Sequence, residues 1–107
     1  MSDTITAPKP YTEQRTKRQP PYNVILLDDD DHTYDYVIRM LQELFAHPFE
    51  TAYLMAVEVD TSGRVIVLTT SKEHAELKCD QIHAFGADPL SSRGCAGSMS
   101  AVIEPAI

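Results

Sequence analysis

The stretch YNVILLDDDDHTYDYVIRMLQELF, residues 22–45, joins a short apolar run, four consecutive aspartates and a helical pattern. The apolar run at residues 24–27 is rich in strand-forming side chains and ends at the aspartates 28–31, which predicts a buried strand with an acidic end. From Thr33 to Phe45 the apolar side chains recur at the spacing of an amphipathic helix. The fold therefore begins with a strand that runs through an acidic turn into a helix.

Downstream of residue 45 the sequence predicts a second helix and a second strand. Pro48 stands where a helix would start, and apolar side chains continue at helical spacing until the turn sequence Thr61-Ser62-Gly63. Residues 64–69, RVIVLT, are β-branched and apolar enough to form a strand that is buried on most of its surface.

A third helix and a last strand complete the pattern. Thr70 and Glu73 form the sequence T-x-x-E, which predicts a capping box and a helix that reaches about Phe85. Residues 87–98 are rich in Gly, Ser and Pro and predict a loop, and residues 99–103 predict the last strand. The order β-α-α-β-α-β predicts an α+β domain with a small three-stranded sheet and all helices packed on one face.

Length, composition and charge limit the class of protein. The 107 residues leave room for one domain, and no stretch approaches the roughly 20 apolar residues that span a bilayer. Sixteen acidic side chains against nine basic ones give a net charge of −7, which disfavours nucleic acid as a partner and favours cationic ligands. The N-terminus lacks a secretory signal, so we expect a cytoplasmic protein. Cys79 and His83 have the spacing of half a zinc site, but no second half is evident, and we expect no metal.

The chain divides into an N-terminal extension, residues 1–20, and a domain, residues 21–107. The extension is rich in Thr, Pro, Lys, Arg and Gln and has no apolar periodicity, which predicts a mobile tail. Four of the nine basic residues lie in it, so the domain is more acidic than the whole chain. The tail either solubilises the domain or engages a partner.

The four aspartates allow several functions. They can act as helix N-caps and solvated charges with no further role. The run VILLDDDD is also similar to the first strand of receiver domains, but the elements are too few for a five-stranded parallel sheet. The aspartates could also bind a divalent cation, but the sequence has no Gly-containing loop of calcium-binding spacing. A third function is recognition of an ammonium group, whose three donors match carboxylate acceptors at the mouth of an apolar groove.

Most of the chain resembles the ClpS-type adaptors of the N-end rule. Residues 22–45 match the strand, the Asn-Asp-Asp motif and the following helix of that family without a gap. The similarity continues through FETAYLMAVEVDTSGRVIVLTTSKEHAELK, residues 49–78, and resumes near Met99. The resemblance implies a ClpS-like adaptor domain over residues 21–107, with the fold that ClpS shares with the C-terminal domain of the ribosomal stalk.

The resemblance also implies a binding site. The positions that bind the amino group of the substrate in the family are occupied here by three carboxylates, Asp28, Asp29 and Asp60. The positions of its side-chain pocket are occupied by Asp30, His32, Tyr34, Val37, Ala56, Val59 and Met99. Tyr34 replaces a gatekeeping Met and Ala56 a second Met, which predicts a reshaped pocket. The positions that contact the chaperone are occupied by Glu73, Glu76 and Lys78.

We therefore expect an adaptor, without catalytic activity or cofactor, that binds the free N-terminal residue of substrate proteins and delivers them to a Clp AAA+ protease. The expected partners are the N-terminal domain of a ClpA- or ClpC-type chaperone and proteins with bulky hydrophobic first residues. We expect the chain to act as a monomer. Two alternatives stay open: a regulatory protein that docks on the chaperone without delivering substrate, and the receiver-like or cation-binding domain.

Overall fold

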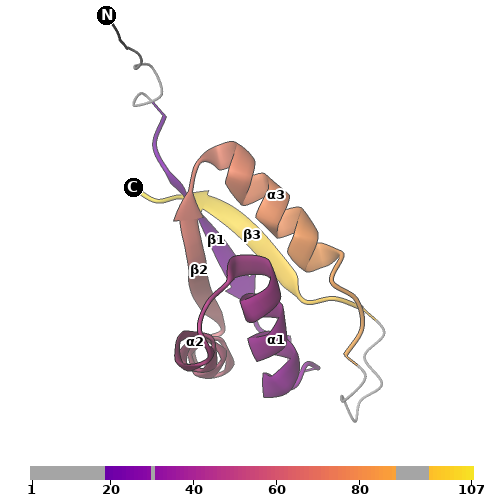
Figure 1. Ribbon diagram of the computed structural model, residues 1–107. Coiled ribbons are helices and arrows are strands. Elements are labelled where there is room, and N and C mark those ends of the chain that lie inside the picture. Colours follow the sequence, from indigo (N-terminus) through magenta and orange to yellow (C-terminus); the bar gives the residue numbers. More distant parts are fainter. Residues whose placement is uncertain (1–18, 30, 89–96) are drawn as a thin grey trace, which may run out of the picture.

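The computed structural model describes residues 19–29, 31–88 and 97–107, which form one layer of helices on one sheet (Figure 1). The expected tail lies outside these residues except for its last two, so its character stays a prediction. The elements follow the expected order: β1 (Tyr22–Leu27), α1 (Tyr34–Phe45), α2 (Phe49–Ser62), β2 (Arg64–Thr70), α3 (Lys72–His83) and β3 (Ser100–Pro105).

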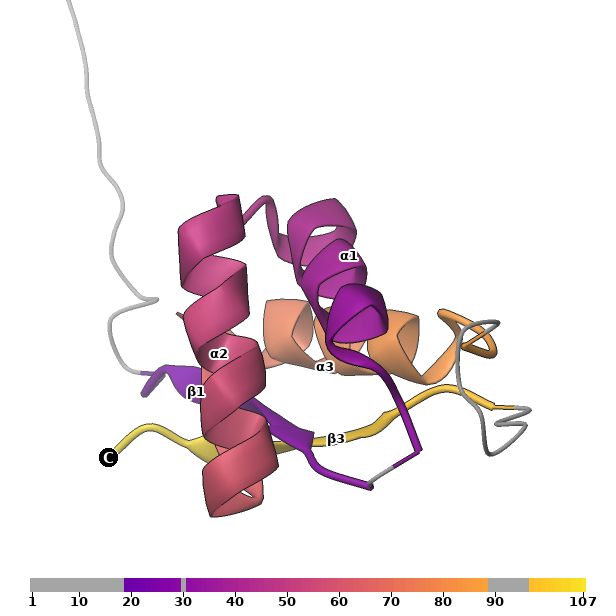
Figure 2. The ribbon, with the colours of Figure 1, turned by 90° about the horizontal axis from the view of Figure 1, so that it is seen from below.

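The sheet has the order β2-β1-β3, and both pairs of neighbouring strands are antiparallel. The register between β1 and β2 shifts between Val24 and Ile25, which marks a β-bulge. All three helices lie on the same side of the sheet, with α1 beside α2 and α3 running along the sheet (Figure 2). The predicted α+β fold is confirmed.

The two faces of the sheet have different surroundings because side chains alternate along a strand. Val24 and Leu26 of β1 are fully buried in the core beneath the helices. Ile25 points to the opposite face and is also fully buried. We attribute its burial to an ion pair between Arg64 of β2 and Glu104 of β3, whose 3.0 Å contact crosses β1 at the level of Ile25.

The ends of the helices follow from local sequence, with two corrections. Thr33 caps α1, its hydroxyl accepting a hydrogen bond from the Tyr36 backbone amide at 3.2 Å. The predicted capping role of Thr70 is wrong: Thr70 pairs with Tyr22 at the end of β2, and Ser71 caps α3 instead.

The second correction concerns the other end of α3, which stops at His83 rather than near Phe85. Gly86, with a φ of 110°, then turns the chain in a backbone conformation that side chains disfavour. The last strand begins one residue later and ends two residues later than the predicted range 99–103. Among the described residues, no helix combines the length and the apolar character that crossing a bilayer would require.

Candidate functional site

The acidic end of β1 lies beside the turn that follows α2. The backbone amide of Asp28 donates a hydrogen bond to the carbonyl of Gly63 at 3.1 Å, although the two residues are far apart in the sequence. Asp60 belongs to the last turn of α2, just before that glycine. The antiparallel pairing of β1 with β2 therefore carries the predicted amino-group residues Asp28 and Asp60 to the same end of the sheet.

Tyr34 connects the start of α1 with the end of α2. Its hydroxyl donates a hydrogen bond to the carboxylate of Asp60 at 2.8 Å. That hydrogen bond, and the negative charges of Asp60 and Asp28, raise the pKa of Tyr34 above its ordinary value. Asp60 thus contacts the hydroxyl directly, and the charge of Asp28 acts on the same side chain, which is 37% exposed.

Asp29, the third predicted amino-group residue, is engaged by its own loop. One carboxylate oxygen accepts hydrogen bonds from the backbone amide of Asp31 at 3.0 Å and from His32 Nδ1 at 2.9 Å. The other carboxylate oxygen lies 2.8 Å from the same ring nitrogen. Asp29 therefore organises the turn between β1 and α1 in this state of the protein.

His32 is enclosed rather than exposed, with only 2% of its side chain accessible to solvent. Its Nε2 lies 2.9 Å from the carbonyl oxygen of Gly97, and its ring centroid is 4.5 Å from that of Tyr36. Burial by itself lowers the pKa of His32. The hydrogen bond and charge of Asp29, the Gly97 carbonyl and the charge of Asp88 outweigh burial and raise it above 6.5.

The apolar residues predicted to line a side-chain pocket belong to one buried cluster. At most 4% of each is exposed, and the four residues are Val37, Ala56, Val59 and Met99. They come from α1, α2 and the residue just before β3, so the fold brings together positions that lie far apart in the sequence. Asp30, also predicted for this pocket, lies outside the described residues.

Two residues that hold this region in place were missed by the sequence analysis. The Asp88 carboxylate is 3% exposed and accepts a hydrogen bond from the Thr33 backbone amide at 2.6 Å. The Tyr36 hydroxyl donates to the carbonyl of Gly86 at 2.5 Å. No local signal identifies Asp88, because an aspartate in a Gly- and Pro-rich loop is usually solvated and its partner is 55 residues away.

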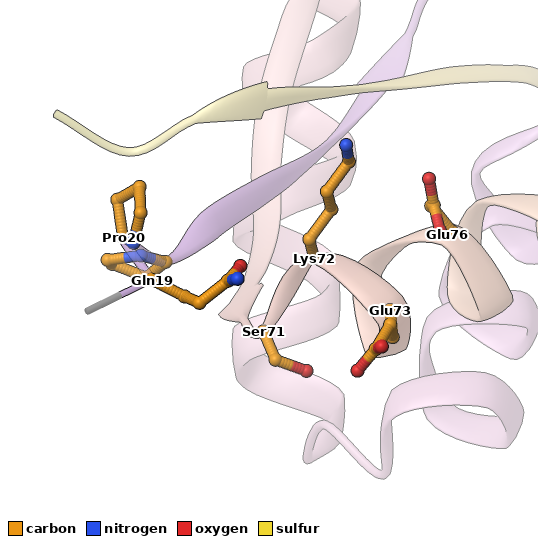
Figure 3. A pocket seen from close by; sticks show the side chains of 7 residues that line it. Gln19, Pro20, Ser71, Lys72, Glu73 and Glu76 are labelled. Carbon is orange, nitrogen blue, oxygen red and sulfur yellow. The ribbon is translucent and has the colours of Figure 1, made fainter. Parts of the chain in front are cut away.

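The predicted docking residues divide between two environments. Glu73 and Glu76 are exposed and line a pocket of about 700 Å³ where the chain enters β1 and α3 begins (Figure 3). Lys78 instead donates a hydrogen bond to the carbonyl of Leu44 at 2.5 Å, and its ammonium lies 5.5 Å from the Phe45 ring centroid. Lys78 therefore caps the C-terminal end of α1.

Cys79 and His83, which have the spacing of half a zinc site, both contact the backbone of β3. Cys79 donates its thiol hydrogen to the carbonyl of Ala101 at 3.2 Å, and Nε2 of His83 lies 3.0 Å from the same oxygen. These contacts attach α3 to β3. Among the described residues, no group of three or more His, Cys, Asp or Glu side chains is arranged to hold a metal ion.

Comparison with known proteins decides the family. The model of the family described as ATP-dependent Clp protease adaptor protein ClpS matches residues 17–92, which is most of the chain. The chain belongs to the ClpS family. The resemblance inferred from the sequence is thereby confirmed, and the protein is placed among the adaptors of Clp proteases.

Members of the ClpS family resemble this chain over most of their length. The ClpS adapter of Pectobacterium carotovorum subsp. carotovorum is 35% identical over 90 residues, which cover 82% of this chain and 81% of the relative. That of Aromatoleum aromaticum is 39% identical over 85 residues, 78% of this chain and 83% of the relative. The structure of Agrobacterium tumefaciens ClpS2 bound to L-phenylalaninamide has a TM-score of 0.70 at 23% identity, covering 82% of this chain and 99% of ClpS2, which supports the ClpS fold.

The receiver alternative is wrong for this ClpS-family chain. A receiver domain has a five-stranded parallel sheet and places its acidic residues at adjacent strand ends. The sheet here has three antiparallel strands, and the third carboxylate of the predicted set, Asp60, comes from a helix rather than from a second strand end.

Proposed function

We propose that this ClpS-family chain binds the free N-terminal residue of substrate proteins between the start of α1 and the end of α2. In this proposal Asp28, Asp29 and Asp60 accept hydrogen bonds from the α-ammonium group. The observation that carries the proposal is that the Asp60 carboxylate accepts a hydrogen bond from the Tyr34 hydroxyl at the end of the sheet where Asp28 also lies. A hydroxyl donates one hydrogen bond, whereas an ammonium donates three and carries the charge that two carboxylates attract.

The first side chain of the substrate would contact the buried apolar residues beneath Tyr34. Because Val37, Ala56, Val59 and Met99 are almost fully buried, a bulky side chain reaches them only after a side chain at the surface moves, and in this proposal that side chain is Tyr34. Tyr34 is attached to its surroundings by one partly exposed hydrogen bond and by an edge-on contact with Tyr53, whose ring centroid is 6.2 Å away. Both contacts can be exchanged for contacts with a ligand at small cost.

Fluorescence anisotropy with a peptide that starts with Phe tests the ammonium contact. We expect the free peptide to bind and its N-acetylated form to bind at least about 10-fold more weakly, since acetylation removes charge-assisted hydrogen bonds. Asp60→Asn should weaken binding of the free peptide by a similar factor. Glu58→Gln, which removes an exposed carboxylate from the same helix, is the matched control and should leave affinity unchanged. Equal affinity for both peptides would reject the proposal.

Delivery requires a second surface, and we propose that Glu73 and Glu76 supply it. The pocket beside these residues is also lined by Gln19, Pro20 and Pro21, so the N-terminal extension leaves the domain next to it. This arrangement supports docking of the N-terminal domain of a ClpA- or ClpC-type chaperone there, with the extension close to the chaperone. In this proposal the adaptor acts as a monomer in the cytoplasm and makes or breaks no covalent bond.

One observation favours the regulatory alternative, a protein that docks on the chaperone without carrying substrate. The Tyr34 hydroxyl already occupies Asp60, one of the acceptors that a substrate would need. Tyr34→Phe distinguishes the two functions, because it frees Asp60 and keeps the ring. An adaptor should bind the free peptide before the change and equally well or more tightly after it, whereas a regulator should bind the peptide in neither form.

A further inference from the structure

Three aromatic rings form a continuous stripe on the exposed side of α1 and α2. The stripe consists of Phe49, Tyr53 and Tyr34. The rings of Phe49 and Tyr53 are stacked with centroids 6.3 Å apart, and Tyr53 meets Tyr34 edge-on at 6.2 Å. Between 37% and 56% of each residue is exposed, so the rings contact one another and solvent at the same time. Contiguous exposed apolar surface of this kind marks interaction sites.

The stripe ends at the proposed amino-group site. Phe49, Tyr53 and Asp60 lie on one flank of α2 because they are spaced at i, i+4 and i+11. Tyr34 joins the two parts in this structure, since its ring contacts Tyr53 and its hydroxyl contacts Asp60. After Tyr34 moves to admit the first side chain, Phe49 and Tyr53 form the stripe. From Asp60 to Phe49 the helix rises about 16 Å, a length that roughly five residues of extended peptide would cover.

The charges around the stripe indicate which peptides fit. Helices α1 and α2 together carry five acidic side chains and one basic side chain, Arg39. Two of the acidic ones lie away from the stripe: Glu43 pairs with Arg39, and Glu58 is half a turn around α2 from Phe49. The Arg39 guanidinium lies 5.5 Å from the Phe85 ring centroid and 3.8 Å from Glu43, on the side of α1 that faces away from α2. Glu50 lies beside Phe49 at the far end of the stripe. A segment with arginine side chains would place guanidinium groups over aromatic rings and near carboxylates.

We propose that the stripe binds residues two to six of the substrate and favours arginine among them. This inference rests on the proposed function, because it takes the first residue of the substrate to be held at Asp60. It adds a second recognition surface, which selects among substrates that begin with the same residue. The aromatic rings supply the contact, and the acidic side chains at the two ends of the stripe, Asp60 and Glu50, set the preference for basic over acidic segments.

Two kinds of probe separate the stripe from the amino-group site. Phenylalaninamide occupies the amino-group site alone, and three hexapeptides extend it: Phe-Ser-Gly-Ser-Gly-Ser, Phe-Arg-Gly-Arg-Gly-Arg and Phe-Glu-Gly-Glu-Gly-Glu. By calorimetry we expect the arginine peptide to bind about 10-fold more tightly than the serine peptide, and the glutamate peptide more weakly than both.

Tyr53→Ser tests whether the rings or only the overall charge cause this gain. We expect the variant to lose most of the advantage of the arginine peptide over the serine peptide. This ratio is the readout, because any change at the amino-group site caused by the lost Tyr34–Tyr53 contact affects both peptides alike. Leu54→Ser is the matched control, because Leu54 is 65% exposed on the same helix but points about 100° away from Tyr53. Leu54→Ser should change neither the affinity for phenylalaninamide nor the advantage of the arginine peptide.

Each contrary result has its own meaning. If phenylalaninamide binds but the three hexapeptides have equal affinities, the stripe is rejected and the amino-group site stands. If Tyr53→Ser keeps the full gain for arginine, general charge attraction explains the preference and the stripe is again rejected. If phenylalaninamide itself does not bind, the amino-group site is rejected and this inference with it.

Discussion

His32 shows how a single enclosed residue links the loop before α1 to the segment before β3. Its ring lies between the Asp29 carboxylate and the Gly97 carbonyl, and both contacts favour the protonated form. Asp88 adds a second negative charge, and Tyr36 covers the ring. These contacts therefore hold the two segments together most strongly when His32 is protonated.

The raised pKa of His32 predicts how stability depends on pH. A group whose pKa is higher in the folded state contributes stability fully below its unfolded value of 6.5 and loses it as pH rises through the folded-state pKa. We expect the free energy of unfolding by urea to fall as pH rises above 6.5, the unfolded-state value of His32. His32→Gln should remove much of this dependence. His74→Gln, on the exposed surface of α3, should retain it, and equal pH profiles for wild type and His32→Gln would contradict the prediction.

At the residue scale, the sequence identifies candidate site residues but does not predict which residues they contact. The resemblance to ClpS identifies Tyr34 and Asp60, but their hydrogen bond joins residues 26 positions apart on two helices. The partner of His32 at Gly97 is 65 positions away. Such contacts depend on how helices pack and where loops return, and no local pattern encodes them.

The C-terminal end of α1 carries backbone strain at one residue, Ala46. Ala46 ends α1 with a φ of 58°, in the left-handed region where a Cβ atom is unfavourable. Its amide nevertheless donates to the carbonyl of Gln42 at 3.1 Å, so the turn is well bonded and the strain is confined to one residue. Glycine at this position would keep the turn and remove the strain.

We therefore expect Ala46→Gly to raise the free energy of unfolding by about 1 kcal/mol. Ala84→Gly is the matched control. Ala84 is equally exposed at the end of α3, but its φ of −103° suits any residue, so glycine there should destabilise by about 0.5 to 1 kcal/mol. Chemical denaturation of both variants measures the difference, and the same sign of change in both would contradict the role of the left-handed turn.

At the element scale, local signals identify each helix and strand but place their ends less well. Thr70 and Ser71 both have a hydroxyl suited to cap α3, and pairing of Thr70 with Tyr22 leaves the cap to Ser71. Similarly, α1 has no basic residue in its last turn, and Lys78 of α3 supplies the missing charge. Both outcomes are decided by tertiary contacts, which a sequence pattern describes only indirectly.

At the scale of the whole molecule, two acidic surfaces lie at opposite ends of β1. Asp28 follows the end of β1, whereas the pocket beside Glu73 and Glu76 lies at its beginning. Six residues of strand span about 20 Å, so the proposed sites for substrate and chaperone are far enough apart to be occupied at the same time. Residues 19–107 contain fourteen acidic and five basic side chains, a formal charge of −9, and both surfaces lie within this acidic part.

This separation predicts that docking and substrate binding can be changed independently. Glu76→Lys reverses a charge at the pocket, about 20 Å from Asp28, a distance at which mutational effects usually add. We expect the variant to bind phenylalaninamide with unchanged affinity but to bind the chaperone N-terminal domain several-fold more weakly, and therefore to slow degradation of a Phe-started substrate. Glu58→Lys makes the same change of charge on α2, away from α3, and should leave chaperone binding intact. If both variants weaken chaperone binding equally, net charge rather than the surface at Glu73 and Glu76 governs docking, because only the position of the new lysine differs between them.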